Sequence, residues 1–404
     1  MKLVKMSLAA AVLLSASAFA IDNIKVSGDA KLFYTTDDAD VNGMGGAPKG
    51  DLFSQGNSAA DTAIRVSVTG DLVKNVSFGA TGYAVSTLGL ENNLVSNVWT
   101  TAHKNVVDDE MWIGELWLAT TMGKTTAKVG RMELDTPLAF TEKWNIVPNT
   151  FEAAVLINQD IPDTTLVGAW VGRTNGYGAG LGTVNSGAKM ETFAAEGAYA
   201  AAIVNNSFKP LTAQAWYYNV ANVADAFWLQ ADIECQLVKG LSIGAQYAEL
   251  SPKKAGLTMA TEDSQAMAFK LGYKVNDALS VSAAYSDVDE ANALAVANVA
   301  TGLTSQSKLY SEAWWNYGYV GVAGAETVTL TAEYDAGIAK LGAYYTDISN
   351  DYTPNKNDLT EMTVTASKSF GAVDATLAYI STESDDQNNG DQFNTIQAYL
   401  TLNF

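Results

Sequence analysis

Charged residues of both signs cluster around the segment from Met132 to Thr150, which we predict to be a long connection. They are Arg131, Glu133, Asp135, Glu142 and Lys143. Acidic groups on a loop that face basic groups on a wall create a transverse field, which orders water and favours polar solutes. These residues therefore predict a charged, water-filled constriction. The alternative is that each charge is merely hydrated.

The basic groups expected on the wall are Lys31, Arg65 and Lys128. Arg65 lies in "TAIRVSVTGDL", where the apolar Ile64 and Val66 alternate with polar residues. Alternation with a period of two is typical of a strand with one apolar and one polar face. The three basic side chains should therefore point to the polar face of their strands.

The sequence gives little support for an enzymatic function. The single histidine, His103, lies in "TTAHKNVVDD" with Asp108 and Asp109 nearby. Acid–base catalysis of the serine–histidine type also needs a nucleophile with a recognisable setting. The sequence contains no nucleophile elbow, zinc motif or phosphate loop. We therefore predict that the protein is not an enzyme.

Two acidic clusters could offer oxygen ligands to calcium: Asp37, Asp38 and Asp40 in "TTDDAD", and Asp385 and Asp386 in "TESDDQNNGD". Neither has the spacing of an EF-hand loop. Solvated loop tips are the simpler interpretation, so we expect no cofactor and at most weakly bound Ca²⁺. The loop tips would meet lipopolysaccharide, if at all, through divalent ions.

The elements that must position these side chains are strands. Segments of about ten residues alternate between apolar and polar positions and end at turn residues, a pattern typical of transmembrane β-barrels. Short connections, such as Met122 to Lys124, alternate along the chain with long ones, such as Thr87 to Asp109 and Asp287 to Glu326. The segments predict an all-β, antiparallel transmembrane barrel of about 18 strands, with 16 or 20 as alternatives. The loop after the fifth strand would fold inward as the constriction.

The first twenty residues form a predicted export signal. Lys2 and Lys5 precede the short apolar run Leu8 to Leu14, and Ala18-Phe19-Ala20 has the small-x-small form of a signal-peptidase site. Residues 21–404 contain no linker or change in composition, so we predict a single barrel domain. One cysteine excludes an intramolecular disulfide framework, and a net charge of −20 argues against nucleic-acid partners.

The chain ends on a strand, "FNTIQAYLTLNF", in which Leu400, Leu402 and Phe404 alternate with polar residues such as Tyr399. In hydrocarbon every backbone N–H and C=O must be paired, so a membrane sheet must close on itself. We therefore predict that this last strand pairs with the first.

The sequence also resembles a known family. The segment Gly123 to Arg173, "GKTTAKVGRMELDTPLAFTEKWNIVPNTFEAAVLINQDIPDTTLVGAWVGR", with the opening "MKLVKMSLAAA" and the closing "IQAYLTLNF", is similar to campylobacterial (epsilonproteobacterial) major outer membrane proteins. It is also similar to the related porin D group. The resemblance implies a Gram-negative outer-membrane location, a homotrimer, passive diffusion of small polar solutes, and recognition of the final Phe404 by the outer-membrane assembly machinery. The arginine ladder of substrate-selective porin D members is not identifiable.

Three functional expectations follow for a barrel of this kind. With 44 Asp plus Glu against 24 Lys plus Arg, a pore of average composition would attract cations. The first expectation is therefore a porin for ions and small hydrophilic solutes with a mild cation preference. The alternatives are a porin selective for small organic acids or amino acids, and a structural or adhesive barrel that is plugged.

Aromatic residues recur near the predicted strand ends, and we expect them to form girdles at the two membrane interfaces. The principal ones are Phe33 and Tyr34, Trp112 and Trp117, Trp216 to Tyr218, and Tyr344 and Tyr345. The aromatic segment "AWWNYGYVG" (Ala313 to Gly321) lies in a long predicted loop instead. It could form a lid, contact a neighbouring subunit or stack against a sugar.

Overall fold

The computed structural model describes residues 21–40, 50–95, 109–144, 146–176, 189–192, 196–253, 262–290, 294–299, 305–353 and 356–404. The predicted export signal and His103 lie outside these residues. Among the described residues, none of the helical segments is long and apolar enough to cross a membrane.

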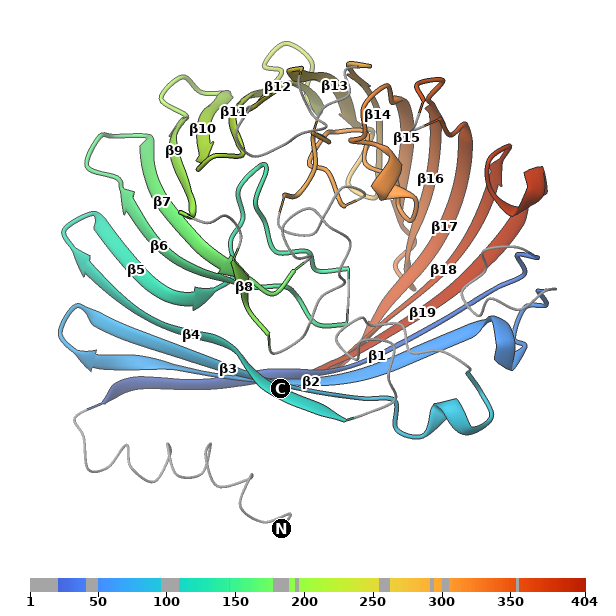
Figure 1. The fold of residues 1–404 in the computed structure, drawn as a ribbon, viewed down its shortest axis with the longest axis horizontal. Helices are drawn as coiled ribbons and strands as arrows, with labels where there is room; N and C mark the ends of the chain where they lie inside the picture. Colours follow the sequence, from blue (N-terminus) through green and yellow to red (C-terminus); the bar gives the residue numbers. More distant parts are fainter. Residues whose placement is uncertain are drawn as a thin grey trace.

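Strands form a single antiparallel sheet in the described residues, and Figure 1 shows them arranged as a ring. They are β1 (Asp22–Asp37), β2 (Ser58–Val73), β3 (Val76–Ser86), β4 (Glu110–Met122), β5 (Thr125–Met132), β6 (Phe151–Asn158), β7 (Thr164–Thr174), β8 (Glu191–Thr192), β9 (Ala198–Asn205), β10 (Leu211–Val220), β11 (Ala224–Glu234), β12 (Leu241–Pro252), β13 (Ser264–Lys274), β14 (Leu279–Val288), β15 (Glu326–Asp335), β16 (Lys340–Ser349), β17 (Leu359–Phe370), β18 (Val373–Ser384) and β19 (Phe393–Asn403). Short 3-10 turns complete the elements: η1 (Gln55–Asn57), η2 (Leu90–Asn92), η4 (Tyr317–Tyr319) and η5 (Asn388–Gly390).

The closed wall of the barrel consists of eighteen strands, as predicted. The two-residue β8 pairs only with the end of β7, whose remaining length pairs with β9. Of the 19 delimited strands, β8 therefore adds no position to the ring. The sheet closes because β19 pairs with β1, from Asp29 opposite Asn403 to Asp37 opposite Thr395. The alternatives of 16 and 20 strands are wrong.

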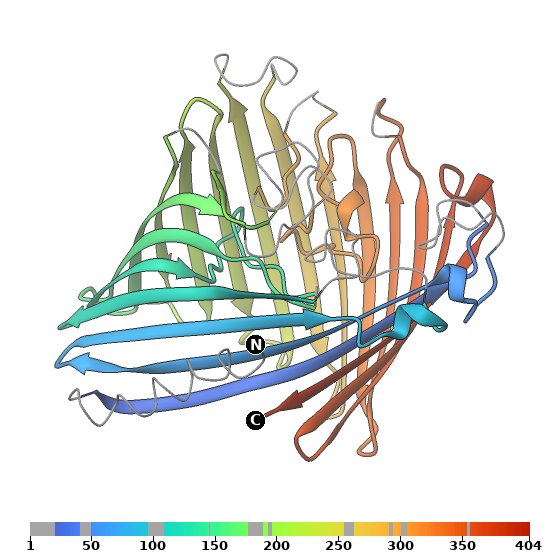
Figure 2. The same cartoon turned by 60° about the horizontal axis from the view of Figure 1, so that its bottom comes forward.

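Short turns lie at one end of the barrel and long loops at the other (Figure 2). Gly123 and Gly371 have φ values of 61° and 68° in the turns after β4 and β17. Positive φ suits glycine and gives tight hairpins whose twist matches that of the strands. The predicted turn positions are confirmed, and the main difference is that β1 and β2 extend further, which shortens the first loop to residues 38–57.

Side chains alternate between an apolar outer face and a polar inner face, as the sequence pattern predicts. On β17, Met362 and Val364 are exposed outside, whereas Thr363 and Thr365 are buried inside. On β11, Phe227 and Leu229 face outward and Trp228 faces inward, buried completely. The outer face thus forms the apolar band that a membrane barrel requires.

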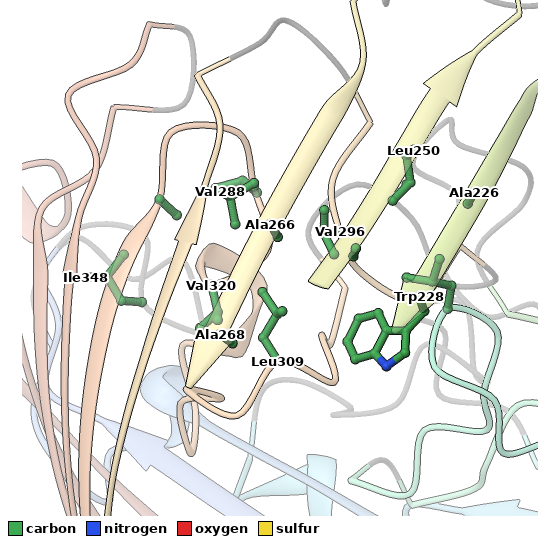
Figure 3. Close-up of a cluster of buried hydrophobic side chains, with 14 of the residues drawn as sticks. Ala226, Trp228, Leu250, Ala266, Ala268, Val288, Val296, Leu309, Val320 and Ile348 are labelled. Carbon is green, nitrogen blue, oxygen red and sulfur yellow. The ribbon is translucent and has the colours of Figure 1, made fainter. Parts of the chain in front are cut away.

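The barrel interior contains two inward-folded loops, drawn in teal and orange inside the ring of Figure 1. We call them L3 (residues 133–150, between β5 and β6) and L7 (residues 289–325, between β14 and β15). L7 packs on the inner wall of β10 to β17 through a cluster of buried apolar side chains, shown in Figure 3. Its members include Leu138 of L3, Trp216, Trp228, Leu250, Val288, Val296, Leu309, Val320 and Ile348. Burial of these side chains inside the barrel holds L7 against the wall.

The prediction of aromatic girdles is wrong for several residues. Phe33, Trp112, Trp216 and Tyr218 are buried, and they pack against the inward loops. They fill space between wall and loop because L3 and L7 offer them apolar partners inside the barrel. Tyr217 is exposed on the outer face, where a girdle residue belongs.

Barrel closure places the residues of the last strand on two faces. Leu400, Leu402 and Phe404 are exposed outside, and Tyr399 points inward, where its ring lies 4.6 Å from that of Phe33. The Phe404 N–H donates a hydrogen bond to the carbonyl oxygen of Gly28 on β1 (3.0 Å), and the Gly28 N–H donates one to the Phe404 carbonyl oxygen (2.8 Å). A Cβ atom on Gly28 would lie 2.6 Å from the Phe404 ring and 2.3 Å from the Arg65 carbonyl oxygen.

Gly28→Leu should therefore weaken barrel closure. The new side chain must displace the Phe404 ring and a neighbouring backbone, and overpacking of this kind costs about 1–3 kcal/mol. We expect the variant to unfold at a temperature several degrees lower, measured by heat-dependent migration in SDS gels. Gly168→Ala is the control, because a Cβ atom there meets nothing within 4 Å. Equal thermal stability of Gly28→Leu and the control would contradict the role of this contact.

Candidate functional site: the loop-lined constriction

L3 folds inward because its own hydrogen bonds and apolar side chains fix it. Thr141 N donates to Leu134 O (2.8 Å) and Glu142 N donates to Asn149 Oδ1 (2.7 Å). Ile146 and Val147 are buried against a cluster on β1 to β4 that includes Tyr83 and Trp112. The loop is thus tied to the wall on the side of the first four strands.

L7 is anchored to the wall at β17 by one buried carboxylate. Glu361 of β17 is almost completely buried and accepts hydrogen bonds from the backbone N–H groups of Trp314 (3.0 Å), Trp315 (3.1 Å) and Asn316 (2.8 Å). The Asn316 side chain donates a further bond of 2.8 Å. Charge-assisted bonds are stronger than neutral ones, so Glu361 fixes the aromatic part of L7.

A second anchor of L7 lies on β12. Gln246 donates from Nε2 to Lys308 O (3.0 Å) and accepts from Tyr310 N (3.0 Å). The Tyr310 hydroxyl donates to Asp232 Oδ1 on the neighbouring strand β11. Side chains of the wall thus satisfy backbone groups of L7 that would otherwise lack partners.

The two loops join each other across the lumen. Asn298 of L7 accepts from Phe140 N (3.1 Å) and donates to Phe140 O (2.7 Å) and Glu142 Oε1 (3.0 Å). Lys308 forms an ion pair with Asp135, and the Trp144 and Tyr317 rings lie 5.5 Å apart. L3 and L7 therefore act as one partition that narrows the barrel.

Two adjoining cavities lie along this partition, and Lys143 lines both. The first, about 400 Å³, lies between L3, L7 and the wall of β1, β18 and β19; Lys31, Phe33, Lys143, Trp144, Trp314 and Tyr399 line it. The second, about 410 Å³, lies between the loops themselves; Glu133, Asp135, Lys143, Lys308 and Glu312 line it. A small solute in these spaces would meet both signs of charge and aromatic surfaces.

Ion pairs organise the charges of the constriction. Arg65 lies 2.6 Å from Asp29 on β1 and 3.7 Å from Glu133 on L3, and Glu133 also pairs with Lys143 at 3.1 Å. The Lys128 ammonium lies 4.1 Å from the centre of the Trp117 ring. Within the described part of the chain, Lys31 has no ion-pair partner, so its ammonium group is available to a solute.

Of the predicted constriction residues, most lie inside the barrel. Lys31, Arg65 and Lys128 are on the inner wall, and Glu133, Asp135 and Lys143 of L3 line the cavities. Glu142 is buried within L3, where it accepts from Trp144 Nε1 (2.8 Å), so it supports the loop rather than lining the passage.

The placement of Arg131 in the constriction is wrong. β5 extends through Met132, so the alternation that turns Lys128 inward turns Arg131 outward, beside the exposed Leu116 of β4. There Arg131 donates to Glu152 of β6 (3.0 Å) and to the Ile113 carbonyl (2.7 Å).

Several lining residues were not predicted from sequence: Trp144, Lys308, Glu312 and Trp314. The segment "AWWNYGYVG" carried the available signal, since a soluble loop rarely concentrates so many aromatic side chains. The structure places this segment inside the barrel, with the Trp314 ring 5.0 Å from Tyr344 on β16. It therefore belongs to the constriction.

The acidic loop residues proposed as calcium ligands accept hydrogen bonds within the protein. Asp37 accepts from Asn57 Nδ2 (3.1 Å), Asp38 from Asn394 N (2.6 Å), and Asp40 from Gly50 N (3.2 Å). Among the described residues, no group of three or more acidic, histidine or cysteine side chains could hold a metal. These bonds tie the first loop to the start of β19.

Residues 238–402 match the family model described as Gram-negative porin. The match covers β12 to β19, with L7 between them. This chain has the fold of an outer-membrane porin. None of the curated proteins matches its sequence.

The same porin barrel occurs in solved structures from Pseudomonas aeruginosa. OccK3 (OpdO) is similar with a TM-score of 0.72 and 14% identity, covering 95% of this chain and 96% of that one. OccK9 (OpdG) has a TM-score of 0.73 at 12% identity, covering 95% and 99%. OpdK, solved with vanillate, has a TM-score of 0.71 at 12% identity, covering 95% and 98%. The closed barrel and the porin match place the protein in the outer membrane of a Gram-negative bacterium.

Proposed function

We propose that the protein is a passive diffusion channel for ions and small hydrophilic solutes. The observation that carries this proposal is the charged passage between L3, L7 and the wall of β1, β18 and β19. Its lining combines Lys31 and Lys143 with the aromatic Trp144 and Trp314. Such a lining is wettable, and an 18-stranded barrel is wide enough for water around the loops.

Single-channel recording of the purified protein in a planar bilayer tests this proposal. We expect discrete, long-lived openings with ohmic current. If no conductance steps occur at any salt concentration, the barrel is plugged, and this result would support the structural or adhesive alternative instead. Closure in three equal steps would support the homotrimer, which the resemblance to campylobacterial major outer membrane proteins implies.

A mild cation preference is the ion selectivity that we propose. The charges around the constriction nearly balance, because Arg65, Lys143 and Lys308 are paired with Asp29, Glu133 and Asp135. The strong acidic excess of the whole chain then decides the sign. Reversal potentials in a salt gradient measure this preference directly.

Glu312 should make the cation preference depend on pH. It lines the passage between the loops, and desolvation by the surrounding groups, aided by the nearby charge of Glu142, raises its pKa to about 7, while Gln306 and Lys308 oppose this rise. A carboxyl with a raised pKa is neutral below that value and negative above it. Cation preference should therefore increase from about pH 6 to about pH 8, and less so in Glu312→Gln. An identical pH profile of the reversal potential in the variant would contradict this assignment.

A second candidate function is a porin selective for small organic acids. The observation that favours it is the ammonium group of Lys31, which forms no ion pair among the described residues and lines the same cavity as Trp144 and Tyr399, where it would hold a carboxylate attached to a ring. Among the relatives, OpdK was solved with vanillate. Narrow selectivity is disfavoured because the chain has only three arginines and only Arg65 faces the lumen. Block of the ionic current by benzoate, lost in Lys31→Gln, would establish this function.

The remaining partners follow from the location and the resemblance. Outer-membrane lipid and lipopolysaccharide would surround the apolar face, and the assembly machinery would recognise Phe404 before closure. We expect no metal or cofactor to be needed for conductance, and calcium at the loop tips would be weakly held. Unchanged conductance after treatment with a chelator is the expected result.

A further inference from the structure

Two of the three arginines of this chain lie on the outer face of the barrel. Arg131 and Arg173 flank Glu152 on adjacent strands β5, β6 and β7, in the register Arg131–Glu152–Arg173. A lipid-facing arginine near the bilayer midplane destabilises a barrel by about 2–4 kcal/mol, but by little near the interfaces. Their presence on this face therefore requires an explanation.

The guanidinium groups of Arg131 and Arg173 differ in the hydrogen bonds and ion pairs that they form. Arg131 donates to Glu152 and to the Ile113 carbonyl, and its side chain is 23% exposed. Arg173 is 57% exposed, and among the described residues its ion-pair partner is Glu152, at 3.9 Å from its Nε. The terminal N–H groups of Arg173 are thus free to bind an anion.

The row lies at the loop-side ends of its strands. Arg131 is next to the last residue of β5, Glu152 is the second residue of β6, and Arg173 precedes the last residue of β7. Trp170, exposed directly beneath Arg173, is a typical interface residue. Long loops face outward in outer-membrane barrels, so the row lies at the headgroups of the outer leaflet.

The charge of this row differs from that at other described positions of the same rim. On β10 to β12 and on β16, outward carboxylates next to the rim accept hydrogen bonds from tyrosines. The pairs are Tyr217 with Asp225 (3.0 Å), Tyr247 with Glu249 (2.6 Å) and Tyr345 with Asp347 (3.4 Å), and Asp225 also forms an ion pair with Lys253 at 3.0 Å. A phosphate group would be repelled by Glu249 and Asp347 and attracted by the arginines on β5 to β7.

A shallow apolar depression, about 470 Å³, continues down the outer wall from the arginine row. Leu118, Val129, Ala154, Leu156 and Gly168 line it. Val129 and Ala154 are two residues below Arg131 and Glu152 on the same face of their strands. The small side chains of Ala154 and Gly168 leave room for a hydrocarbon chain beside the wall.

We infer that Arg131, Arg173 and this depression form a binding site for one phosphorylated glycolipid of the outer leaflet. The guanidinium groups hold a headgroup phosphate, which they can bind in a bidentate manner, and an acyl chain fills the depression. Glu152 orients the two arginines and keeps them apart. The inference rests on the outer-membrane location and is independent of what passes through the pore.

A second copy of the chain could cover the same wall, but the charges favour lipid. In a two-fold dimer, an isologous contact would place Arg131 and Arg173 of one copy near the same residues of the other, and like charges repel. The contacts of a three-fold trimer are heterologous, so the same residues need not meet there. A phosphate of charge −1 to −2 complements two arginines that share a single Glu152. Oligomerisation through this wall is therefore an outcome that the experiment must be able to detect.

The test is native mass spectrometry of the purified protein in detergent, titrated with diphosphorylated lipid A. We expect one retained lipid per chain, with affinity about tenfold lower in Arg173→Gln and intermediate in Arg173→Lys, which keeps the charge without the planar fork. Dephosphorylated lipid A should bind no better to the wild type than to Arg173→Gln. Inorganic phosphate at millimolar concentration should not compete, because it lacks the acyl chain.

Lys368→Gln is the matched control, since Lys368 is an exposed cation near Phe370 at the turn-side end of β17. This variant should bind lipid A like the wild type. Equal affinity of Arg173→Gln and wild type, or equal losses in Arg173→Gln and Lys368→Gln, would overturn the site. A mass shift to dimers or trimers that Arg173→Gln abolishes without any lipid would assign the wall to a second copy instead. Single-channel conductance of Arg173→Gln should match that of the wild type, which separates this test from that of the channel.

Discussion

Glu361→Ala should raise single-channel conductance severalfold and make the current noisy. This carboxylate accepts hydrogen bonds from three consecutive backbone N–H groups of L7 and from the Asn316 side chain. Removing it leaves buried donors without partners, each at a cost of about 1–3 kcal/mol. The aromatic part of L7 should then leave the wall, and the lumen should approach the width of an 18-stranded barrel without that loop.

Glu383→Ala is the control for that variant, because Glu383 is an exposed carboxylate on the outer face of the neighbouring strand β18. It should conduct like the wild type. Glu361→Gln, which keeps one acceptor oxygen, should be intermediate in conductance. If Glu361→Ala folds and retains wild-type conductance with quiet openings, L7 does not narrow the passage.

The double change Lys31→Glu and Lys143→Glu should produce the largest change in ion selectivity. Both lysines line the same cavity beside the wall of β1, and Lys31 has no ion-pair partner among the described residues. Two unit charges within about 4 Å of an ion interact with it by about 1 kcal/mol each in water. Reversing both should raise the cation-to-anion permeability ratio about tenfold or more, measured as reversal potential in a potassium chloride gradient.

Lys340→Glu provides a comparison at a distant place, with the same type of charge reversal at a single residue. Lys340 is an exposed residue at the start of β16, on the turn side of the barrel. The reversal potential of the Lys340→Glu variant should stay close to that of the wild type. A double variant that behaves like Lys340→Glu would show that ions pass elsewhere, for example along the opposite wall.

The strand pattern of this protein is readable from sequence because it is local. Each strand alternates between lipid-facing apolar and lumen-facing polar residues, and each turn carries its own signal, such as Gly123 or Gly371. These local signals predicted the closed 18-stranded barrel and inward positions for Lys31, Arg65 and Lys128. Arg131 was misplaced because it was treated as the first residue of a loop, although the alternation of β5 continues through it.

Contacts between distant segments could not be predicted in the same way. The length of L7 is visible in the sequence, but its direction depends on Glu361, 45 residues from Asn316 in the chain. The join between L3 and L7 depends on Asn298, which is 158 residues from Phe140.

The sequence by itself determined the barrel, the two faces of its wall and the basic residues on the inner face, because hydrocarbon and water impose a period of two on every strand. Only the tertiary structure decided which loop groups meet across the lumen, and that Arg131 and Arg173 share Glu152 outside. The reason is physical: a loop has no repeating environment, so its path is set by the particular wall side chains that satisfy its backbone.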